Sequence, residues 1–371
     1  MRVLERIYFE TLARCRPENL LRVPDDAPRN VVAIGKCAAA LFSAVRDVRD
    51  ALVIVPEGYP RAEGVECLSG GHPEMTPASF AAGKRLIEFV EQHDDILFLI
   101  SGGGSACVEW PLPEYTQEQL MRINHELIAS GRPIGQINAK RKRYSAIKGG
   151  RLGARARGRV VTMVYSDVSS GALGDVASGP VLENMQLIAD NSTLVRTAAD
   201  LGVRQLAAAM DCAGLPARRR QAAAIQGCGK PQHSVIVWDK QIECDVAEAA
   251  EQLANAAREL VPNQLLVAGG EPTVAVTGMG KGGRCCELAA RFALHEVHGV
   301  EALFGSSDGV DGNSGAAGAI LPASRAAIDA ESIRSQLAAS NSLAVVEILG
   351  RPIMIPPTGN NLRDLVLLAR A

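Results

Sequence analysis

The sequence predicts an α/β protein with two domains, and three observations support this. Short apolar runs rich in branched residues stop repeatedly at glycine-rich or acidic turns, which is typical of buried strands in an open sheet. Segments with helical spacing separate these runs. The length of 371 residues exceeds that of one ordinary domain. We place a linker at the low-complexity residues 212–220, and therefore expect domains over residues 1–220 and 221–371.

The composition excludes several classes of protein. Hydrophobic residues make up 47% and charged residues 22% of the chain, which is ordinary for a globular protein. A formal net charge of −2 gives no field that would gather nucleic acid or an anionic membrane. No apolar run approaches the ~20 residues of a membrane helix, and residues 1–16 carry charges throughout instead of a signal-peptide core. We expect a cytoplasmic protein with a small-molecule partner, without nucleic acid or membrane.

The cysteines indicate reduced thiols. The chain has nine of them, an odd number, dispersed and without a C-x-x-C pair. This pattern argues against a disulfide frame and against a zinc site. Cys285 and Cys286 are adjacent, which strains disulfide geometry, so we expect both to be free.

The first candidate site residue follows the first expected strand. A helix over residues 1–15 and a polar linker over 16–29 precede this strand, at 31–34, and a helix over 37–45 follows it. Lys36 therefore stands between the carboxyl end of a strand and the amino end of a helix. Open α/β sheets bind ligands at such places, and a lysine there suits a phosphate. A solvated surface lysine is the alternative.

A glycine loop follows a later strand. We expect strands at 51–55 and 96–100 and a helix at 77–92, with His72 in a loop as a candidate substrate contact or a structural residue. The loop consists of Ser101, Gly102, Gly103, Gly104 and Ser105. Three glycines let successive N–H groups face one point, so this loop is predicted to hold a phosphate or carboxylate. A plain turn is the alternative. Walker spacing is absent, so this is no standard P-loop.

A basic run and an aspartate come next. Helices are expected over 116–129 and 138–152, and the second carries a run of cations that includes Lys142. Because the chain lacks net positive charge and an aromatic stacking platform, triphosphate neutralisation explains the run better than nucleic-acid binding; a solvated face is the alternative.

A strand at 160–164 ends near Asp167, a candidate general base or magnesium ligand, with turn capping as the alternative.

The last third repeats the alternation of strands and helices. We expect helices at 193–210 and 246–260, strands at 222–225, 235–237, 265–267 and 353–355, and a C-terminal helix. Gly278, Gly280 and Gly283 match G-x-G-x-x-G, a weak signal alone, and the usual acid at the end of the next strand is not at the required spacing. Asp308 and Asp311 lie in a glycine-rich loop, which favours magnesium or hydroxyl contacts over ribose recognition.

The residues at the ends of the expected strands can form one site. In a parallel sheet the carboxyl ends lie on one edge, and two domains can face one another across a cleft. The expected strand ends are at Lys36, Ser101, Asp167, Glu271, Asp308 and Thr358. Anion loops, cations and carboxylates at such ends are the parts of magnesium-dependent phosphoryl transfer.

An ordered set of motifs then resembles the glycerate 2-kinase family over nearly the whole chain. The motifs are Gly35-Lys36, Gly71-His72-Pro73, Ser101–Ser105, Asn138 with Arg141-Lys142, Lys148-Gly149-Gly150, Ser166-Asp167-Val168, Ser178-Gly179-Pro180, Gly269-Gly270-Glu271, Gly282-Gly283-Arg284, Asp308-Gly309, Asp311-Gly312 and Pro357-Thr358-Gly359 with Asn361. The resemblance implies a larger Rossmann-like three-layer domain, a smaller mixed-sheet MOFRL-type domain and an active site in the cleft between them. It also implies ATP- and Mg²⁺-dependent phosphorylation of the 2-hydroxyl of D-glycerate.

The resemblance also implies roles for residues. Lys36 and Arg284 would neutralise the transferred phosphate or the substrate carboxylate, and Asp167 would be the base or a metal ligand. Asp308 would bind metal. The expected substrate and phosphate contacts are the glycine loop, Lys142, Glu271, Asp311 and Asn361.

The chain departs from the family pattern inside its motifs. The departures are Met75, Thr76, Arg143, Gly171, Asn184, Cys285, Cys286 and Asn360. They leave three alternatives open: another hydroxylated acceptor, an NAD(P)H-dependent hydroxypyruvate reductase, and a non-catalytic protein that binds anions or nucleotides. For the adjacent cysteines we favour packing over a nucleophilic role. A homodimer is one alternative for assembly.

Overall fold

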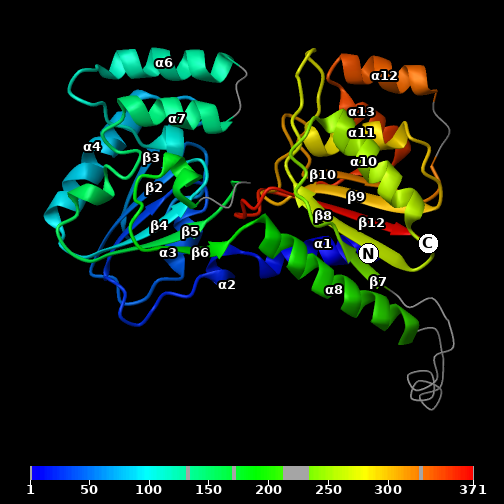
Figure 1. The fold of residues 1–371 in the computed structure, drawn as a ribbon, viewed down its shortest axis with the longest axis horizontal. Coiled ribbons are helices and arrows are strands. Elements are labelled where there is room, and N and C mark those ends of the chain that lie inside the picture. Colours follow the sequence, from blue (N-terminus) through cyan, green and yellow to red (C-terminus); the bar gives the residue numbers. More distant parts are fainter. Residues whose placement is uncertain (1, 131–133, 169–172, 212–233, 326–328, 371) are drawn as a thin grey trace. The chain divides into compact units, whose positions relative to one another are not determined.

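The computed structural model describes residues 2–130, 134–168, 173–211, 234–325 and 329–370, which form two compact units. The parallel-sheet unit is Arg16–Asp190, and the mixed-sheet unit combines Met1–Cys15 with Asn191–Ala371. Each contains one six-stranded sheet with helices (Figure 1), so the predicted α/β class is confirmed. The division falls at 190/191 and differs from the expected 220/221. The expected linker at 212–220 lies outside the described residues.

The parallel-sheet unit has the strand order β3-β2-β1-β4-β5-β6, with every neighbouring pair parallel. Its strands are β1 (Asn30–Ile34), β2 (Asp50–Pro56), β3 (Glu66–Gly70), β4 (Ile96–Ser101), β5 (Val160–Tyr165) and β6 (Met185–Ala189). The sequence did not predict β3 and β6, which are edge strands with few buried residues and no apolar run. All six carboxyl ends lie on one edge of the sheet.

Helices cover the faces of this sheet. They are α2 (Pro17–Leu20), α3 (Ala38–Ser43), α4 (Pro77–Gln92), α5 (Gly104–Cys107), α6 (Gln117–Ala129) and α7 (Ile134–Tyr144), with 3₁₀ turns η1 (Gly153–Arg155) and η2 (Leu173–Ser178). Leu86 and Phe89 of α4 pack with Ile34 and Phe98 in one core. The predicted helix over 138–152 ends earlier, at Tyr144, because the chain turns there and pairs Ser145 with Pro111.

The mixed-sheet unit has the strand order β11-β10-β9-β12-β8-β7. Its strands are β7 (Ser234–Val237), β8 (Gln264–Gly270), β9 (Val300–Ser306), β10 (Gly318–Leu321), β11 (Arg351–Pro352) and β12 (Asp364–Arg370). Because β12 is antiparallel to both β8 and β9, these two strands run in the same direction. Their carboxyl ends therefore meet the first residue of β12, Asp364, at one edge.

Two predictions for this unit were wrong. The C-terminal residues form β12, a central strand, and not a helix. Because β12 is buried on both faces, its sequence is a continuous apolar run. The periodicity of such a run cannot distinguish a buried strand from a buried helix. Residues 353–355 form no strand, since the short pairing with β10 involves β11 just before them. The predicted strand at 222–225 lies outside the described residues.

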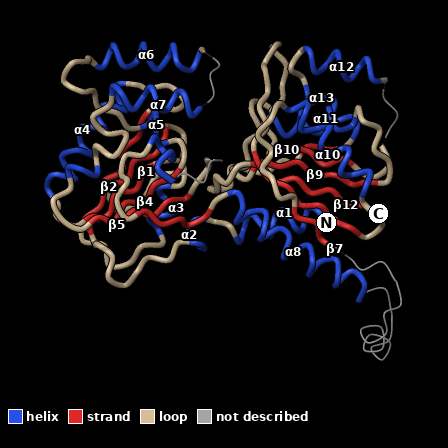
Figure 2. The backbone as a smooth tube through the Cα atoms, in the orientation of Figure 1, coloured by secondary structure: helices blue, strands red, loops and turns tan. Residues whose placement is uncertain are grey.

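Helices lie on both faces of the mixed sheet (Figure 2). They are α1 (Val3–Arg14), α8 (Asn191–Asp211), α10 (Val246–Glu259), α11 (Arg284–Ala293), α12 (Ala330–Ala338) and α13 (Ser342–Leu349). The first two pack against each other on one face, and α10, α11 and α13 share a core with the opposite face. Tyr8 of α1 is buried and donates through its hydroxyl to Ser306 O at 2.6 Å. No helix among the described residues has the length and apolar character needed to span a membrane.

Candidate active site

The junction of β1 and β4 positions Lys36. Its backbone N donates to Gly102 O at 2.8 Å. The Ser101 hydroxyl accepts from Cys37 N at 3.1 Å and donates to Ile34 O at 3.2 Å, so it braces the junction from inside. Gly35 has φ +112°, and a Cβ there would lie 2.4 Å from Ser101 O. Lys36 is thereby fixed at the carboxyl edge, as the sequence predicted.

The glycine loop turns directly beside Lys36. Gly103 has φ +84°, and a Cβ at this position would lie 2.8 Å from Lys36 Cγ. Helix α5 begins at the next residue, Gly104. The Nζ atom of Lys36 lies 5.8 Å from the centroid of the Tyr59 ring, a cation–π contact. Glycine is thus required at 103 both for the turn and for the approach of the lysine stem.

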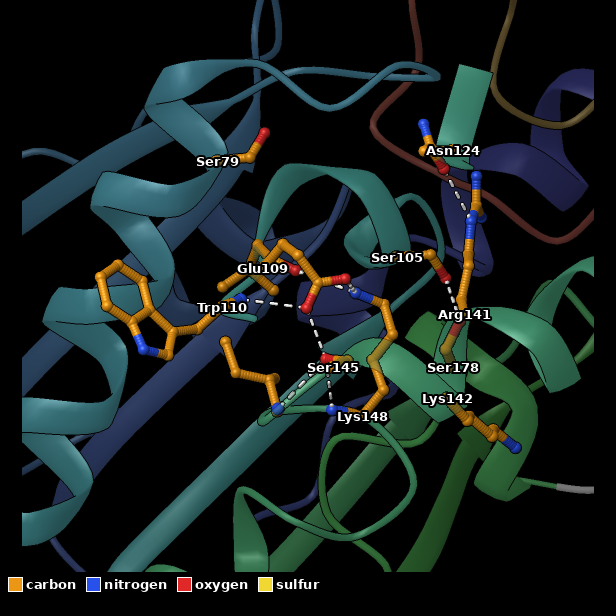
Figure 3. Close-up of polar contacts among 12 residues, drawn as sticks. Ser79, Ser105, Glu109, Trp110, Asn124, Arg141, Lys142, Ser145, Lys148 and Ser178 are labelled. Carbon is orange, nitrogen blue, oxygen red and sulfur yellow. Dashed lines mark hydrogen bonds and ion pairs between the residues drawn. The ribbon is translucent and has the colours of Figure 1, made fainter. Parts of the chain in front are cut away.

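A chain of polar groups leads from the glycine loop to α7. The Ser178 hydroxyl lies 2.8 Å from the Ser105 hydroxyl (Figure 3). It donates to Asn138 Oδ1 at 3.0 Å. Arg141 Nη1 also donates to Asn138 Oδ1, at 3.5 Å, and Arg141 Nε donates to Asn124 Oδ1 at 2.9 Å. Because the Ser178 proton is committed to Asn138, the Ser105 hydroxyl is the donor to Ser178.

The structure divides the basic run into residues with different partners. Lys148 is 1% exposed and forms a buried ion pair with Glu109, which is also 1% exposed (Figure 3). Arg151 is exposed and donates to three backbone carbonyls in and after the last turn of α7. Triphosphate neutralisation is therefore wrong for the buried Lys148, and for Arg151 it stays a prediction. Nothing in the local sequence indicates Glu109, because its partner lies 39 positions away.

Lys142 already has an anionic partner. Its Nζ lies 3.0 Å from Asp175 Oδ1 and 3.5 Å from Gly174 O. The pair is partly exposed, so solvent screens it and it is weak. A phosphate that approached Lys142 would compete with Asp175, and the proposed phosphate contact of Lys142 stays a prediction.

Asp167 lies at the same edge as the glycine loop. Tyr165, the last residue of β5, pairs in register with Ser101, and Asp167 is two residues beyond it. The carboxylate-bearing turn is held by Ser166, whose backbone N donates to Ala189 O at 2.8 Å and whose hydroxyl accepts from Val168 N at 3.3 Å. Gly171, one of the departures, lies outside the described residues.

His72 is a neutral histidine at this edge. It follows β3, and burial lowers its pKa to about 4, with the charges of Lys36 and Arg141 acting in the same direction. Hydrogen bonds through Ser105, Ser178 and Asn138 connect Arg141 to the glycine loop, against which the stem of Lys36 lies. The effect of both charges on His72 agrees with one cluster of these three residues, which are 36 and 69 positions apart in sequence.

The edge of the mixed sheet holds Arg284 between two carboxylates. Arg284 Nε and Nη2 donate to the two oxygens of Asp364 at 2.7 and 3.1 Å, and Nη1 lies 3.0 Å from Glu271 Oε1. Arg363 contacts the other Glu271 oxygen at 3.2 Å. The two carboxylates raise the pKa of Arg284, while complete burial raises the pKa of Asp364 to about 6 against the opposing effect of Arg284. Asp364 was missed from sequence because it begins a strand instead of following one.

Asp311 has a different role from the predicted one. It is 1% exposed, and its two oxygens accept from Cys285 N and Cys286 N at 2.9 Å each. These are orphan donors at the start of α11, so Asp311 caps that helix. The predicted contact of Asp311 with substrate is wrong, because both its oxygens face the helix.

Asp308 and Asn361 remain near the edge of the mixed sheet. Asp308 Oδ1 accepts from the Ser306 hydroxyl at 2.6 Å and from Val310 N at 2.9 Å. Asn361 is 7% exposed and precedes Leu362, whose N donates to the Ser307 hydroxyl at 2.8 Å. Within the described ranges, no three His, Cys, Asp or Glu side chains gather as a ready metal site.

Several departures have structural explanations. Asn184 has φ +45° and donates through Nδ2 to Val160 O at 2.8 Å. The family pattern has an aspartate at 184, which could not donate this bond. Asn360 donates to Leu12 O at 3.0 Å. Met75 is buried, and Thr76 N donates to the Ser79 hydroxyl at 3.1 Å at the start of α4.

The two adjacent cysteines belong to the core. Cys285 and Cys286 are both buried, and burial raises the pKa of each thiol well above its ordinary value. A thiol so shifted holds almost no nucleophilic thiolate. The structure therefore supports packing, as predicted.

The glycines of the G-x-G-x-x-G motif allow close approach of neighbouring backbone. A Cβ on Gly278 or Gly280 would lie 2.4 to 2.6 Å from Ala339 O, and one on Gly283 would lie 2.3 Å from Asp311. These glycines let their loop approach the α12–α13 corner and the capping aspartate. Their presence needs no dinucleotide to explain it.

Comparisons with known proteins show which family the chain belongs to. Residues 5–209 match the family model described as "Domain of unknown function (DUF4147)", and residues 264–364 match the MOFRL family. A glycerate 2-kinase of Sulfurisphaera tokodaii is 30% identical, over 91% of this chain and 89% of its own length. The chain belongs to the glycerate kinase family.

Further relatives extend this assignment within the family. The D-glycerate 2-kinase of Thermotoga maritima is 29% identical over 91% of this chain and 89% of its own. The crystal structure of a Thermotoga maritima glycerate kinase superposes with a TM-score of 0.81 at 25% identity, covering 100% of this chain and 99% of that one. A relative from Agrobacterium vitis, 29% identical over 98% of this chain and 93% of its own, carries a hydroxypyruvate reductase name.

Proposed function

We propose that this family member transfers the γ-phosphoryl group of ATP to the 2-hydroxyl of D-glycerate, with Mg²⁺. The observation that carries the proposal is the similarity to glycerate 2-kinases over about nine-tenths of both chains. The local geometry agrees, since a lysine, a glycine loop and an aspartate share one edge of the parallel sheet. Such an edge is where α/β proteins bind phosphorylated ligands.

Three residues carry the chemistry in this proposal. Asp167 accepts the proton of the 2-hydroxyl as its oxygen bonds to the γ-phosphorus and the bond to the β-phosphate oxygen breaks. Lys36 neutralises charge on the phosphates. Arg284 has five N–H groups, and three of them face the carboxylates of Asp364 and Glu271 among the described residues. The remaining N–H groups are presented to the substrate.

Magnesium fits the residues present. Asp167 of the parallel-sheet unit offers carboxylate oxygens, the hard ligands that Mg²⁺ prefers, and so does Asp308 of the mixed-sheet unit. Mg²⁺ in kinases is commonly held by one or two carboxylates together with substrate phosphates. The ion would supply neutralisation of charge on the β- and γ-phosphates.

The test is ADP release by the purified full chain with ATP, Mg²⁺ and D-glycerate. ADP release is expected only when all three are present. Glycerol and a panel of hydroxy acids and sugar acids test other acceptors in the same assay. Oxidation of NADH by hydroxypyruvate in the absence of ATP would instead support the reductase, and nucleotide binding without any turnover would support a binding protein.

A further inference from the structure

Arg141 is a buried cation without an acidic partner among the described residues. It lies on α7 and is 7% exposed. Its two hydrogen bonds go to the uncharged amides Asn124 and Asn138, and the longer of them is 3.5 Å. The charge of Glu109 acts on Arg141, but Glu109 is already paired with Lys148, so the three groups together keep a positive charge. Burying a guanidinium that has no ion-pair partner of its own among the described residues is costly, so this position favours an anion.

Some N–H donors of Arg141 and its neighbour Asn138 have no hydrogen-bond partner among the described residues. Nη2 of Arg141 makes no hydrogen bond with any described residue. The same holds for Nδ2 of Asn138, a side chain that is 6% exposed and whose Oδ1 accepts from both Ser178 and Arg141. Neither nitrogen is among the fully buried side-chain atoms that lack a partner, so both are open to solvent and to a ligand. Together they provide the donors that an oxyanion needs.

Two further groups belong to this cluster. The stem of Lys36 lies against Gly103 of the glycine loop, and hydrogen bonds through Ser105, Ser178 and Asn138 connect that loop to Arg141. The charges of both cations lower the pKa of His72, and its neutral imidazole offers one N–H and adds no charge. The carboxylate whose charge acts on Arg141, Glu109, is paired with Lys148.

We propose that Arg141, His72 and Asn138, with Lys36, form an oxyanion subsite that receives the carboxylate of the acceptor. This inference rests on the proposed function and names the part of that site that selects the substrate. A planar carboxylate matches the guanidinium fork of Arg141. The nucleotide phosphates are the other source of an oxyanion, but the glycine loop offers them its own donors. A neutral polyol such as glycerol would leave Arg141 unpaired and is rejected.

The test replaces Arg141 with Met, which keeps the length of the stem and removes the charge. Arg122→Met is the control, because Arg122 is an exposed cation on α6, the helix that packs beside α7. In Arg141→Met the KM for D-glycerate is expected to rise about 10²-fold, as for loss of a buried charged hydrogen bond, while the KM for ATP changes less than about 3-fold. The control is expected to change neither. A rise in the KM for ATP alone would overturn the assignment to the acceptor.

Binding gives a readout that does not need turnover. D-glycerate is titrated calorimetrically into each protein, with and without a non-hydrolysable ATP analogue, and glycerol serves as the neutral comparison. The wild type and Arg122→Met are expected to bind D-glycerate, and Arg141→Met is not. If the chain is not a glycerate kinase but binding still depends on Arg141, the subsite stands. Equal binding by both variants, or none by the wild type under either condition, overturns it.

Further variants distinguish a loss of D-glycerate binding from a loss of the fold. Arg141→Lys keeps the charge without the fork, and it is expected to retain part of the affinity for D-glycerate. If Arg141→Met does not fold, Arg141→Lys and His72→Asn replace it in the same titrations. Full affinity in both of these variants would contradict the subsite.

Discussion

Arg284 Nε donates to Asp364 Oδ2 at 2.7 Å, and the carboxylate that receives it is 2% exposed. The two residues are 80 positions apart, and the antiparallel pairing of β12 with β8 and β9 brings them together. Asp364 and Glu271 hold the guanidinium from two sides. This contact fixes the direction in which Arg284 presents its remaining N–H groups, so Asp364 is a positioning residue.

Asp364→Asn should lower kcat and alter its pH dependence. Burial raises the pKa of Asp364 to about 6, so the charged form that holds Arg284 is lost as the pH falls through about 6. Wild-type kcat is expected to fall through this range, whereas the variant should lack that limb. For stability the sign is opposite: the native state keeps the proton between about pH 4 and 6, so ionisation of Asp364 costs stability as the pH rises. An unchanged pH profile of kcat would contradict the positioning role.

Removing one partner of the buried Glu109–Lys148 pair should strongly destabilise the parallel-sheet unit. Removing one partner of a buried ion pair costs about 3–5 kcal/mol, so Lys148→Met should reduce the free energy of unfolding by that order. Glu109→Gln with Lys148→Met should cost less than Lys148→Met alone, since Gln can still accept from Trp110 N. The chain has two tryptophans, Trp110 and Trp238. Urea unfolding in a Trp238→Phe background reports on Trp110 alone.

A cost of the double change equal to the sum of the single changes would show that the two charges do not interact. The exposed pair of Arg155 and Glu91 provides the control. Its removal should cost under about 1 kcal/mol.

Asp311→Asn should affect stability and not the magnesium requirement. The change removes a charge that caps two free N–H groups in the first turn of α11, those of Cys285 and Cys286, which is worth about 1 kcal/mol. The free energy of unfolding, followed by Trp238 fluorescence, should fall by that amount, while the Mg²⁺ concentration for half-maximal activity stays the same. Asp329→Asn is the matched control, since Asp329 caps α12. A shift in the Mg²⁺ requirement with stability unchanged would return Asp311 to the metal site.

Asp167→Asn should remove most phosphoryl transfer and leave the fold intact. Loss of a general base costs about 10²–10⁴-fold in kcat. Asp26→Asn serves as the control, because Asp26 pairs with Arg159 beside the opposite end of β5. Circular dichroism checks the fold of both variants. Unchanged kcat in Asp167→Asn would take this residue out of the mechanism.

Local patterns predicted the elements that end in the candidate site. Lys36 and the glycine loop were located because an apolar run followed by glycine marks a strand end, and that rule needs only neighbouring residues. Asp364 escaped the same rule because it opens an antiparallel strand. Lys148 looked like one more cation of a run, since its burial depends on Glu109, far away in sequence. Asp311 was placed correctly in its loop, but which group it faces is decided by tertiary packing.

The central claim is the position of the transferred phosphoryl group, and ³¹P NMR of the product measures it directly. A phosphate on the 2-hydroxyl of D-glycerate is attached to a carbon that bears one hydrogen, so proton coupling splits its signal into a doublet. A phosphate on the 3-hydroxyl is attached to a carbon that bears two hydrogens and gives a triplet. The account predicts a doublet that appears only with ATP, Mg²⁺ and D-glycerate together. A triplet, or no phosphorylated product in the presence of bound nucleotide, would contradict it.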